Sequence, residues 1–148
     1  MNIEYIEDLI DRENINLIDT YLEDTAGAYI NYDKLNVILY DTSKINSSNE
    51  KKEILAEELG HYYTDSVYRF NSDLQFISKQ EYKAHKFSYN MLIPFENLRR
   101  AILSGKTSIL SLAEHFDVTS QFMAKCIAFY LEKYGQIITQ EEMLQVSI

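Results

Sequence analysis

The sequence feature that most constrains the fold is residues 54–63, I-L-A-E-E-L-G-H-Y-Y. Its larger apolar residues recur at the spacing of an amphipathic helix: Ile54, Leu55, Leu59 and Tyr62. Gly60 lowers helix propensity, and its small size allows another backbone to approach closely. Glu57 and His61 are one turn apart and project in the same direction. The segment therefore predicts a packed helix that presents a carboxylate and an imidazole at one point.

The same residues have the spacing of a zinc-binding motif with one ligand changed. In H-E-x-x-H, two imidazoles four residues apart bind the metal, and the glutamate after the first histidine is the general base. Here Glu58 and His61 occupy their places, but Glu57 stands where the first histidine belongs. Glu57 is therefore either a carboxylate ligand in place of imidazole or the mark of an inactive site.

A second helix offers the remaining ligands. It is predicted to begin at Ser78 or Lys79, after an irregular segment 65–77, and to continue through Met91 before Pro94. Glu81 and His85 are four residues apart on one face of it. Glu57, His61, Glu81 and His85 then form a candidate metal site. The alternative is that both Glu/His pairs are ordinary surface pairs.

The remainder of the sequence predicts an α+β fold with a small antiparallel sheet and a helical body. We expect a helix over 3–13 and strands over 15–21, 28–32 and 36–40, with Asp33-Lys34 as a tight hairpin. The polar loop 43–49 should cap the helix of residues 54–63 through Ser47, Ser48 or Asn49.

Three shorter helices are predicted after the single proline. They cover 95–103, 108–115 and 120–134, with Thr107 and Thr119 as N-caps of the last two, and the tail from Gln136 is expected to be irregular. At 148 residues we predict one domain, 1–148. Its parts are the helix and sheet (1–45), the two ligand-bearing helices (46–94) and the C-terminal helices (95–148).

Charge and cysteine content indicate the compartment and restrict the partners. Residues 1–65 carry 15 acidic and 5 basic side chains, which disfavours unaided nucleic-acid binding. The single Cys126 excludes an intramolecular disulfide, and we expect it to be an inert core thiol. No signal peptide and no apolar run of membrane-spanning length is present. We therefore expect a cytoplasmic protein with no membrane partner.

Three ordered motifs resemble the ImmA/IrrE family of zinc metallopeptidases. L-A-E-E-L-G-H over 55–61 is similar to that family's L-A-H-E-L-G-H. E-x-x-A-x-x-F-S-x-x-M-L-x-P over 81–94 resembles its E-x-x-A-x-x-F-A-x-x-L-L-x-P, and L-A-E-x-F-x-V over 112–118 resembles its L-A-x-x-F-x-V. Order and spacing correspond over roughly residues 1–135.

The resemblance implies a minimal zincin-like metallopeptidase fold with helix-turn-helix-like C-terminal helices. It implies His61 and Glu81 as zinc ligands and Glu58 as general base. It also implies a protein substrate, namely a helix-turn-helix repressor of a prophage, another mobile element or a stress regulon. Glu57 departs from the family's pattern, so a catalytically impaired protein that only binds the repressor is the alternative.

The carboxylate at position 57 changes the expected metal chemistry. The ligands Glu57, His61 and Glu81 together neutralise a divalent ion, which weakens its Lewis acidity and favours oxygen-preferring ions. Zinc remains the cofactor that the resemblance implies, and manganese is the alternative that the carboxylate ligands favour. His85 could compensate by supplying a second nitrogen ligand.

The C-terminal helices superficially resemble a DNA-binding helix-turn-helix. A helix that reads bases needs polar side chains on its exposed face, whereas 120–134 is rich in apolar residues and contains only Lys125 and Lys133 as bases. We therefore expect this helix to be buried, without direct nucleic-acid binding. A small transcription regulator that uses these helices is the third hypothesis, after the peptidase and the protein that only binds a repressor.

Overall fold

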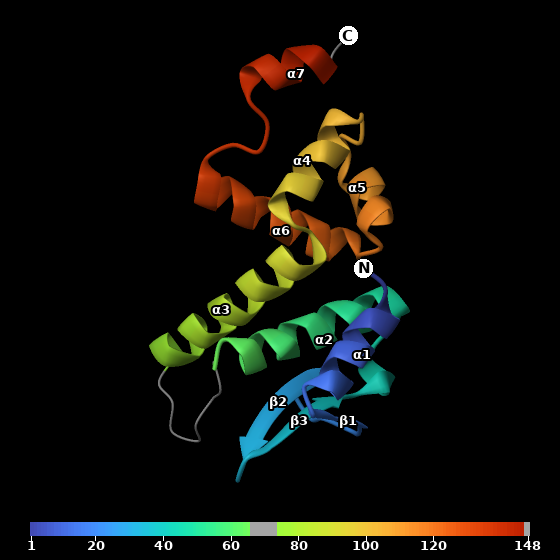
Figure 1. Cartoon of the computed structure of the whole chain (residues 1–148), viewed down its shortest axis with the longest axis vertical. Coiled ribbons are helices and arrows are strands. Elements are labelled where there is room, and N and C mark those ends of the chain that lie inside the picture. The colour runs from blue at the N-terminus through green and yellow to red at the C-terminus, as the bar shows by residue number, and fades with distance from the viewer. Residues whose placement is uncertain (66–73, 147–148) are drawn as a thin grey trace. The chain divides into compact units, whose positions relative to one another are not determined.

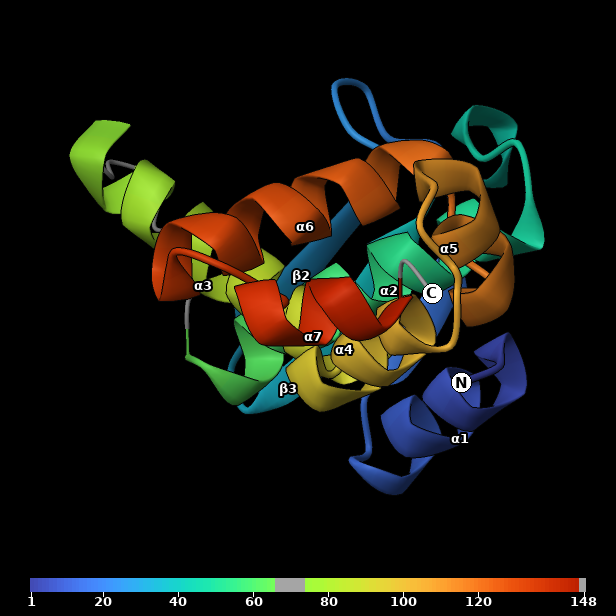
Figure 2. The same cartoon turned by 90° about the horizontal axis from the view of Figure 1, so that it is seen from above.

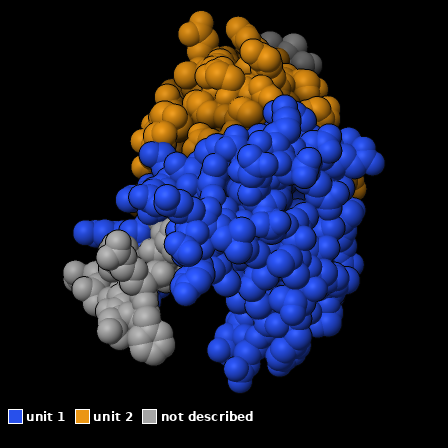
Figure 3. Space-filling model, turned by 60° about the horizontal axis from the view of Figure 1, so that its bottom comes forward, with its two compact units in different colours: residues 1–88 blue, residues 89–148 orange. Residues whose placement is uncertain are grey.

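The computed structural model describes residues 1–65 and 74–146, and the chain forms two compact units, 1–88 and 89–148 (Figures 1 and 3). The α+β class predicted from the sequence is confirmed. The sequence-based division into a single domain stays a prediction. The described helices include none long and apolar enough to cross a membrane.

The first unit begins with helix α1 (Ile3–Arg12), as predicted. The side chain of Asn2 accepts a hydrogen bond of 3.0 Å from the Tyr5 backbone N–H and caps the helix. Ile6 and Ile10, one turn apart, are both buried. Their burial places one face of α1 against helix α2 (Ser48–Tyr63).

The sheet is mixed, so the prediction of a wholly antiparallel sheet is wrong. Strands β2 (Gly27–Tyr32) and β3 (Leu35–Tyr40) form the predicted hairpin, with positive φ at Asp33 and Lys34. Strand β1 (Asn16–Asp19) pairs with β3 in parallel, and the order is β1-β3-β2. The reason is the connection 20–26, which carries the chain from one edge of the sheet to the other before the hairpin starts.

Helix α2 lies at the centre of the first unit and packs against α1, β2 and β3 (Figure 1). Ser47 caps it by accepting a 3.1 Å hydrogen bond from the Glu50 N–H, which confirms one of the three predicted caps. Part of the predicted loop 43–49 is a short 3₁₀ helix, η1 (Thr42–Lys44). Leu55, Ala56 and Leu59 are fully buried, as the helical pattern predicts.

Helix α3 (Leu74–Leu92) starts earlier than the sequence predicted. Residues 74–77 are helical rather than irregular, because they contain no glycine, proline or turn-forming residue to end a helix. The rest of that predicted irregular segment, 66–73, lies outside the described residues. The helix ends just before Pro94, as expected.

Gly60 allows α2 to approach the backbone of α3 closely. A Cβ atom at this position would lie 2.7 Å from the Ala84 carbonyl oxygen and 2.9 Å from the Ala84 Cα. Since both contacts are with backbone, no side-chain rotation could relieve them. The glycine expected from the sequence to permit a close approach therefore holds together the two helices that carry the candidate site.

We predict that Gly60→Ala destabilises the protein. Overpacking costs about 1–3 kcal/mol, and it outweighs the gain of about 1 kcal/mol in helix propensity. Thermal or denaturant unfolding should show a lower midpoint, together with weaker divalent-metal binding. Ala84→Gly should not rescue the variant, because the clash is with the backbone of Ala84. An unchanged midpoint would contradict the close packing.

The described part of the second unit contains the end of α3, followed by α4 (Phe95–Leu103), α5 (Ile109–Phe116), α6 (Ser120–Tyr134) and α7 (Gln140–Val146) (Figure 2). Helix α5 packs against α4 and α6, and α7 contacts α4. Leu98, Leu112, Met123 and Tyr130 are among its buried core residues, and the Tyr130 hydroxyl donates a 2.7 Å hydrogen bond to the Ile93 carbonyl.

The predicted caps of the second unit are only partly right. Thr119 caps α6 as predicted, but α5 is capped by Ser108 rather than Thr107. Ser108 forms a reciprocal capping box with Ser111, which a cap one residue earlier could not form. Helix α7 was missed, although Thr139 and Glu142 have capping-box spacing and do bond reciprocally. Arg99 also binds Glu142, at 2.9 Å, and ties α7 to α4.

Helix α6 is less enclosed than the sequence predicted. Met123, Cys126, Phe129 and Tyr130 are buried, whereas a face that includes Gln121, Ala124, Lys125 and Ala128 is exposed. The 3.6-residue period leaves this face free even in a helix that is mostly apolar. Burial raises the pKa of the Cys126 thiol to about 12, which agrees with an inert core cysteine. The lack of direct nucleic-acid binding stays a prediction.

Candidate metal site

Helices α2 and α3 bring the four predicted ligand residues together within the first unit. His61 Nε2 lies 3.5 Å from Glu81 Oε1, so the two helices meet through these side chains. His85 Nδ1 lies 3.4 Å from Glu57 Oε2. Each helix contributes one glutamate and one histidine a turn apart, as their spacing predicted.

Glu57, His61 and Glu81 form a compact donor group. One ligand atom from each residue lies within 4.8 Å of the other two. Two donors bound to a tetrahedral zinc at about 2.1 Å are about 3.4 Å apart. The 3.5 Å between His61 and Glu81 is close to that separation and longer than the usual N–H···O bond of about 2.9 Å. One nitrogen and two carboxylate oxygens therefore fit a divalent cation.

His85 lies beside this group and contacts two of its members. Its Nδ1 faces Glu57 at 3.4 Å, and its Nε2 faces Glu81 Oε2 at 3.6 Å. The two ring nitrogens thus point at different carboxylates. These contacts would let the imidazole orient Glu57 and Glu81, which is the role of residues that surround metal ligands. Its role as a fourth ligand stays a prediction.

The site concentrates negative charge where solvent is partly excluded. Burial is the main cause that raises the pKa of Glu57 to about 8, and the nearby carboxylates of Glu58 and Glu81 raise it further. Burial likewise raises the pKa of Glu58 to about 7. The hydrogen bond from His61 is the main cause that lowers the pKa of Glu81. A divalent cation would relieve the repulsion among these carboxylates.

Strand β2 holds Glu58, the predicted catalytic residue, at the inner side of the site. The backbone N–H of Tyr29 donates a hydrogen bond to the Glu58 carboxylate. A Cβ atom on Gly27 would lie 3.1 Å from Glu58 Oε1 and 2.5 Å from Ile54 Cγ2. A side chain at position 27 would therefore force Ile54 to move, and the Glu58 carboxylate to a smaller extent.

The sequence reasoning missed these two contributions from β2. The predicted strand starts at residue 28, so Gly27 lies outside it, whereas β2 begins at Gly27. A glycine at the edge of a β-rich run is also a sign of close backbone approach. The position of Gly27 therefore indicated a close approach to another segment, but not which residue lies close to it.

Tyr62 and Tyr63, the tyrosines nearest the motif, are packing residues. The Tyr62 hydroxyl donates a 2.8 Å hydrogen bond to Glu13, and its ring meets Tyr29 edge to face. The Tyr63 ring stacks on Phe87 at 5.3 Å. Both rings join α2 to its neighbours in the first unit.

We predict that the metal-free protein loses stability as pH rises from about 5 to about 8. The unfolded chain releases the protons of Glu57 and Glu58 near the usual pKa of 4.5, whereas the folded protein holds them to about 8 and about 7. Deprotonation therefore favours the unfolded chain throughout this window. Thermal melts in chelator at several pH values test this.

Two further melting experiments identify the groups that cause this pH dependence. Glu57→Gln should flatten the dependence of the melting midpoint on pH, because it removes the group with the largest shift. Saturating zinc or manganese should raise the midpoint most at the upper end of the range. A midpoint that stays constant in chelator from pH 5 to 8 would contradict the clustering of buried carboxylates.

Comparison with known proteins gives one match. The model of a peptidase family, M78, described as the IrrE N-terminal-like domain, matches residues 10–127. No curated protein and no solved structure matches the chain. The matched range includes β1 to β3 and all four candidate ligand residues, and it extends into α6.

Proposed function

Because this chain belongs to the M78 peptidase family, a family of metallopeptidases, we propose that it is a metal-dependent endopeptidase whose site is the Glu57–His61–Glu81 group with Glu58. The observation that carries the proposal is the convergence of three donor atoms within 4.8 Å beside a buried glutamate. Zinc is the proposed ion, and manganese is the alternative that the two carboxylate ligands favour.

The ligand residues and Glu58 have different roles in peptide hydrolysis. A divalent ion held there would polarise the scissile carbonyl and acidify water. Glu58 is only 6% exposed and is held by the Tyr29 N–H, so its carboxylate has a fixed orientation. It takes a proton from the attacking water and delivers it to the leaving amine. Burial raises the pKa of Glu58, which helps the side chain to hold the proton between the two transfers.

We further propose that the substrate is a helix-turn-helix repressor of a prophage or another mobile element, and that the protein acts in the cytoplasm, where such repressors bind DNA. The resemblance of its three motifs to the ImmA/IrrE family supports this substrate. The net charge of −9 also suits a partner with a basic, DNA-binding surface.

A non-catalytic antirepressor is the second candidate, and Glu57 is the observation that favours it. With two carboxylates and one imidazole, the group neutralises a divalent ion and weakens its action on substrate. Such a protein would keep the fold and bind the repressor without cutting it.

Incubation of the purified protein with a repressor from the same mobile element tests both candidates. Zinc and manganese are added separately, and intact mass is measured over time. New fragments that require metal and disappear with chelator support the endopeptidase. A stable complex without fragments supports the antirepressor. If neither fragments nor a complex form, the repressor is not the partner. Elemental analysis would then test the metal site independently.

A further inference from the structure

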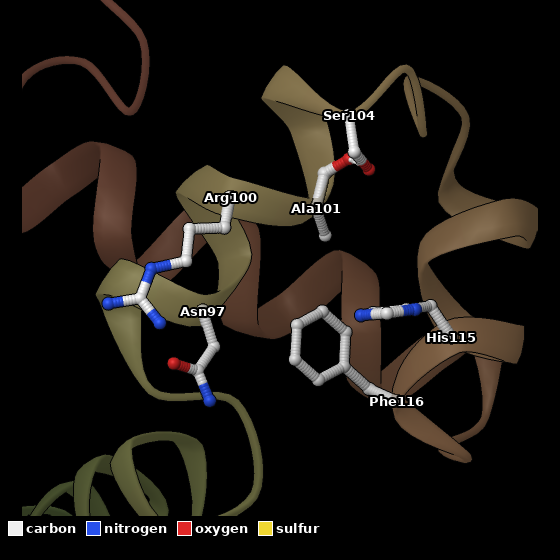
Figure 4. Close-up of a pocket in the computed structure, with 6 residues that line it drawn as sticks. All are labelled: Asn97, Arg100, Ala101, Ser104, His115 and Phe116. Carbon is white, nitrogen blue, oxygen red and sulfur yellow. Dashed lines mark hydrogen bonds between the residues drawn. The ribbon is translucent and has the colours of Figure 1, made fainter.

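A small cavity lies between α4 and α5 in the second unit, outside the proposed metal site. Its volume is about 270 Å³. The lining combines two side chains that can carry positive charge, two neutral polar ones and two apolar ones: Arg100, His115, Asn97, Ser104, Ala101 and Phe116 (Figure 4). The volume is below the roughly 300–1,000 Å³ of drug-sized ligand pockets. It therefore suits a single side chain rather than a nucleotide or other large cofactor.

The cavity is electropositive because its cations are not neutralised from within the unit. Arg99 pairs with Glu96 at 3.6 Å and with Glu142 at 2.9 Å. The adjacent Arg100 is exposed, and among residues 1–65 and 74–146 no carboxylate forms an ion pair with it. Lys106 Nζ lies 3.5 Å from Ser104 Oγ and adds a second cation near the same rim.

The polar groups lie on opposite sides of an apolar floor. Figure 4 shows Arg100 and Asn97 extending from α4 at one side, with the His115 and Phe116 rings of α5 at the other. The imidazole of His115 meets the Phe116 ring edge to face, with centroids 4.8 Å apart. Ala101 and Phe116 supply carbon surface between the polar groups.

This chemistry selects a carboxylate that is attached to a carbon chain. The guanidinium of Arg100 presents a planar fork that matches a carboxylate, and the Asn97 amide on the same side of the cavity can donate a further hydrogen bond. The apolar floor suits the methylene groups that precede a side-chain carboxylate. A phosphate has no such apolar part, so the apolar floor favours an organic carboxylate over inorganic phosphate.

We propose that this cavity binds the acidic side chain of a partner polypeptide. The exposed Leu103, immediately before Ser104, offers carbon surface to an apolar residue next to that acid. The site is a docking site that is independent of the metal-dependent activity proposed above. It would give the protein a second point of contact with an acidic segment of a partner.

Nuclear magnetic resonance titration of the full chain with a short blocked peptide, Leu-Glu-Leu, tests the proposal. We expect saturable shifts confined to resonances of the cavity residues and of Lys106. The matched peptide Leu-Gln-Leu should give no saturable shifts, because it lacks the charge. Arg100→Gln should weaken binding of the acidic peptide at least tenfold. Lys125→Gln removes the same charge from an exposed position on α6 and should leave binding unchanged.

Several outcomes would overturn the assignment. Equal binding by Arg100→Gln, or by the Leu-Gln-Leu peptide, would show that the carboxylate is not recognised in the cavity. Tighter binding of inorganic phosphate at the same residues would make it an anion site of another class. Tighter binding of free glutarate than of the peptide would assign it to a small metabolite. Duplex DNA that shifts the same resonances would favour a nucleic-acid interface.

Discussion

Replacement of Glu58 by glutamine is expected to reduce the rate of peptide cleavage about a thousandfold, within the range of general acid–base catalysis. The amide preserves the shape of the side chain but cannot take a proton from water. Glu58 is not a member of the three-residue donor group, so metal content should remain at the level of the natural protein. The measurement pairs the cleavage rate, followed by intact mass, with elemental analysis of the same sample.

Glu53→Gln is the matched control for this variant. Glu53 is a buried glutamate five residues earlier on α2, and it is not part of the donor group. Its replacement should leave the cleavage rate within a fewfold of the natural value. Loss of metal in Glu58→Gln would show that Glu58 is a ligand rather than a base. An unchanged cleavage rate would remove it from the mechanism altogether.

Glu57→His is expected to have the second-largest effect, an increase of roughly tenfold or more in zinc affinity together with faster cleavage. The variant restores the two-imidazole pattern that zinc prefers and removes one negative charge from the ligands. With less charge donated to it, the ion polarises a carbonyl more strongly. Manganese affinity should change in the opposite direction, because manganese favours carboxylate oxygen. Competition with a chelator of known affinity measures both changes.

His85→Ala distinguishes the two roles open to His85. If its imidazole completes the ligand set beside Glu57, the substitution should lower zinc affinity strongly in the natural chain and weakly in Glu57→His. If it only orients Glu57 and Glu81, the loss should be modest and similar in both backgrounds. If Glu57→His did not strengthen zinc binding, the geometry of α2 and α3 would be unsuited to a second imidazole.

The two variants together also decide between the proposed enzyme and the proposed antirepressor. A natural protein that cleaves, and that Glu58→Gln inactivates, is an endopeptidase with a carboxylate-rich site. A natural protein that binds without cleaving, but gains cleavage through Glu57→His, is an antirepressor on a peptidase scaffold. Both substitutions change only residues of the metal site, so contacts of the repressor with other parts of the protein should be unaffected.

Local spacing predicted every described α-helix except α7, together with the two Glu/His pairs of the candidate site. Glu57 with His61, and Glu81 with His85, are each one turn apart, and that relation depends only on the helical period. The caps Ser47 and Thr119 could also be predicted, because an N-cap bonds to a backbone N–H three residues away. Each of these relations lies within a few residues of chain.

Long-range packing determined the strand pairing and the distances within the site, which the local sequence does not predict. The parallel pairing of β1 with β3 depends on which edge of the sheet the connection 20–26 reaches. The hydrogen bond from Tyr29 to Glu58, and the lack of room for a side chain at Gly27, depend on how β2 packs against α2. The orientation of His85 toward two carboxylates depends on the separation of α2 and α3, which Gly60 and the backbone of Ala84 set. Such distances arise from contacts between segments far apart in the chain, where residue spacing carries no information.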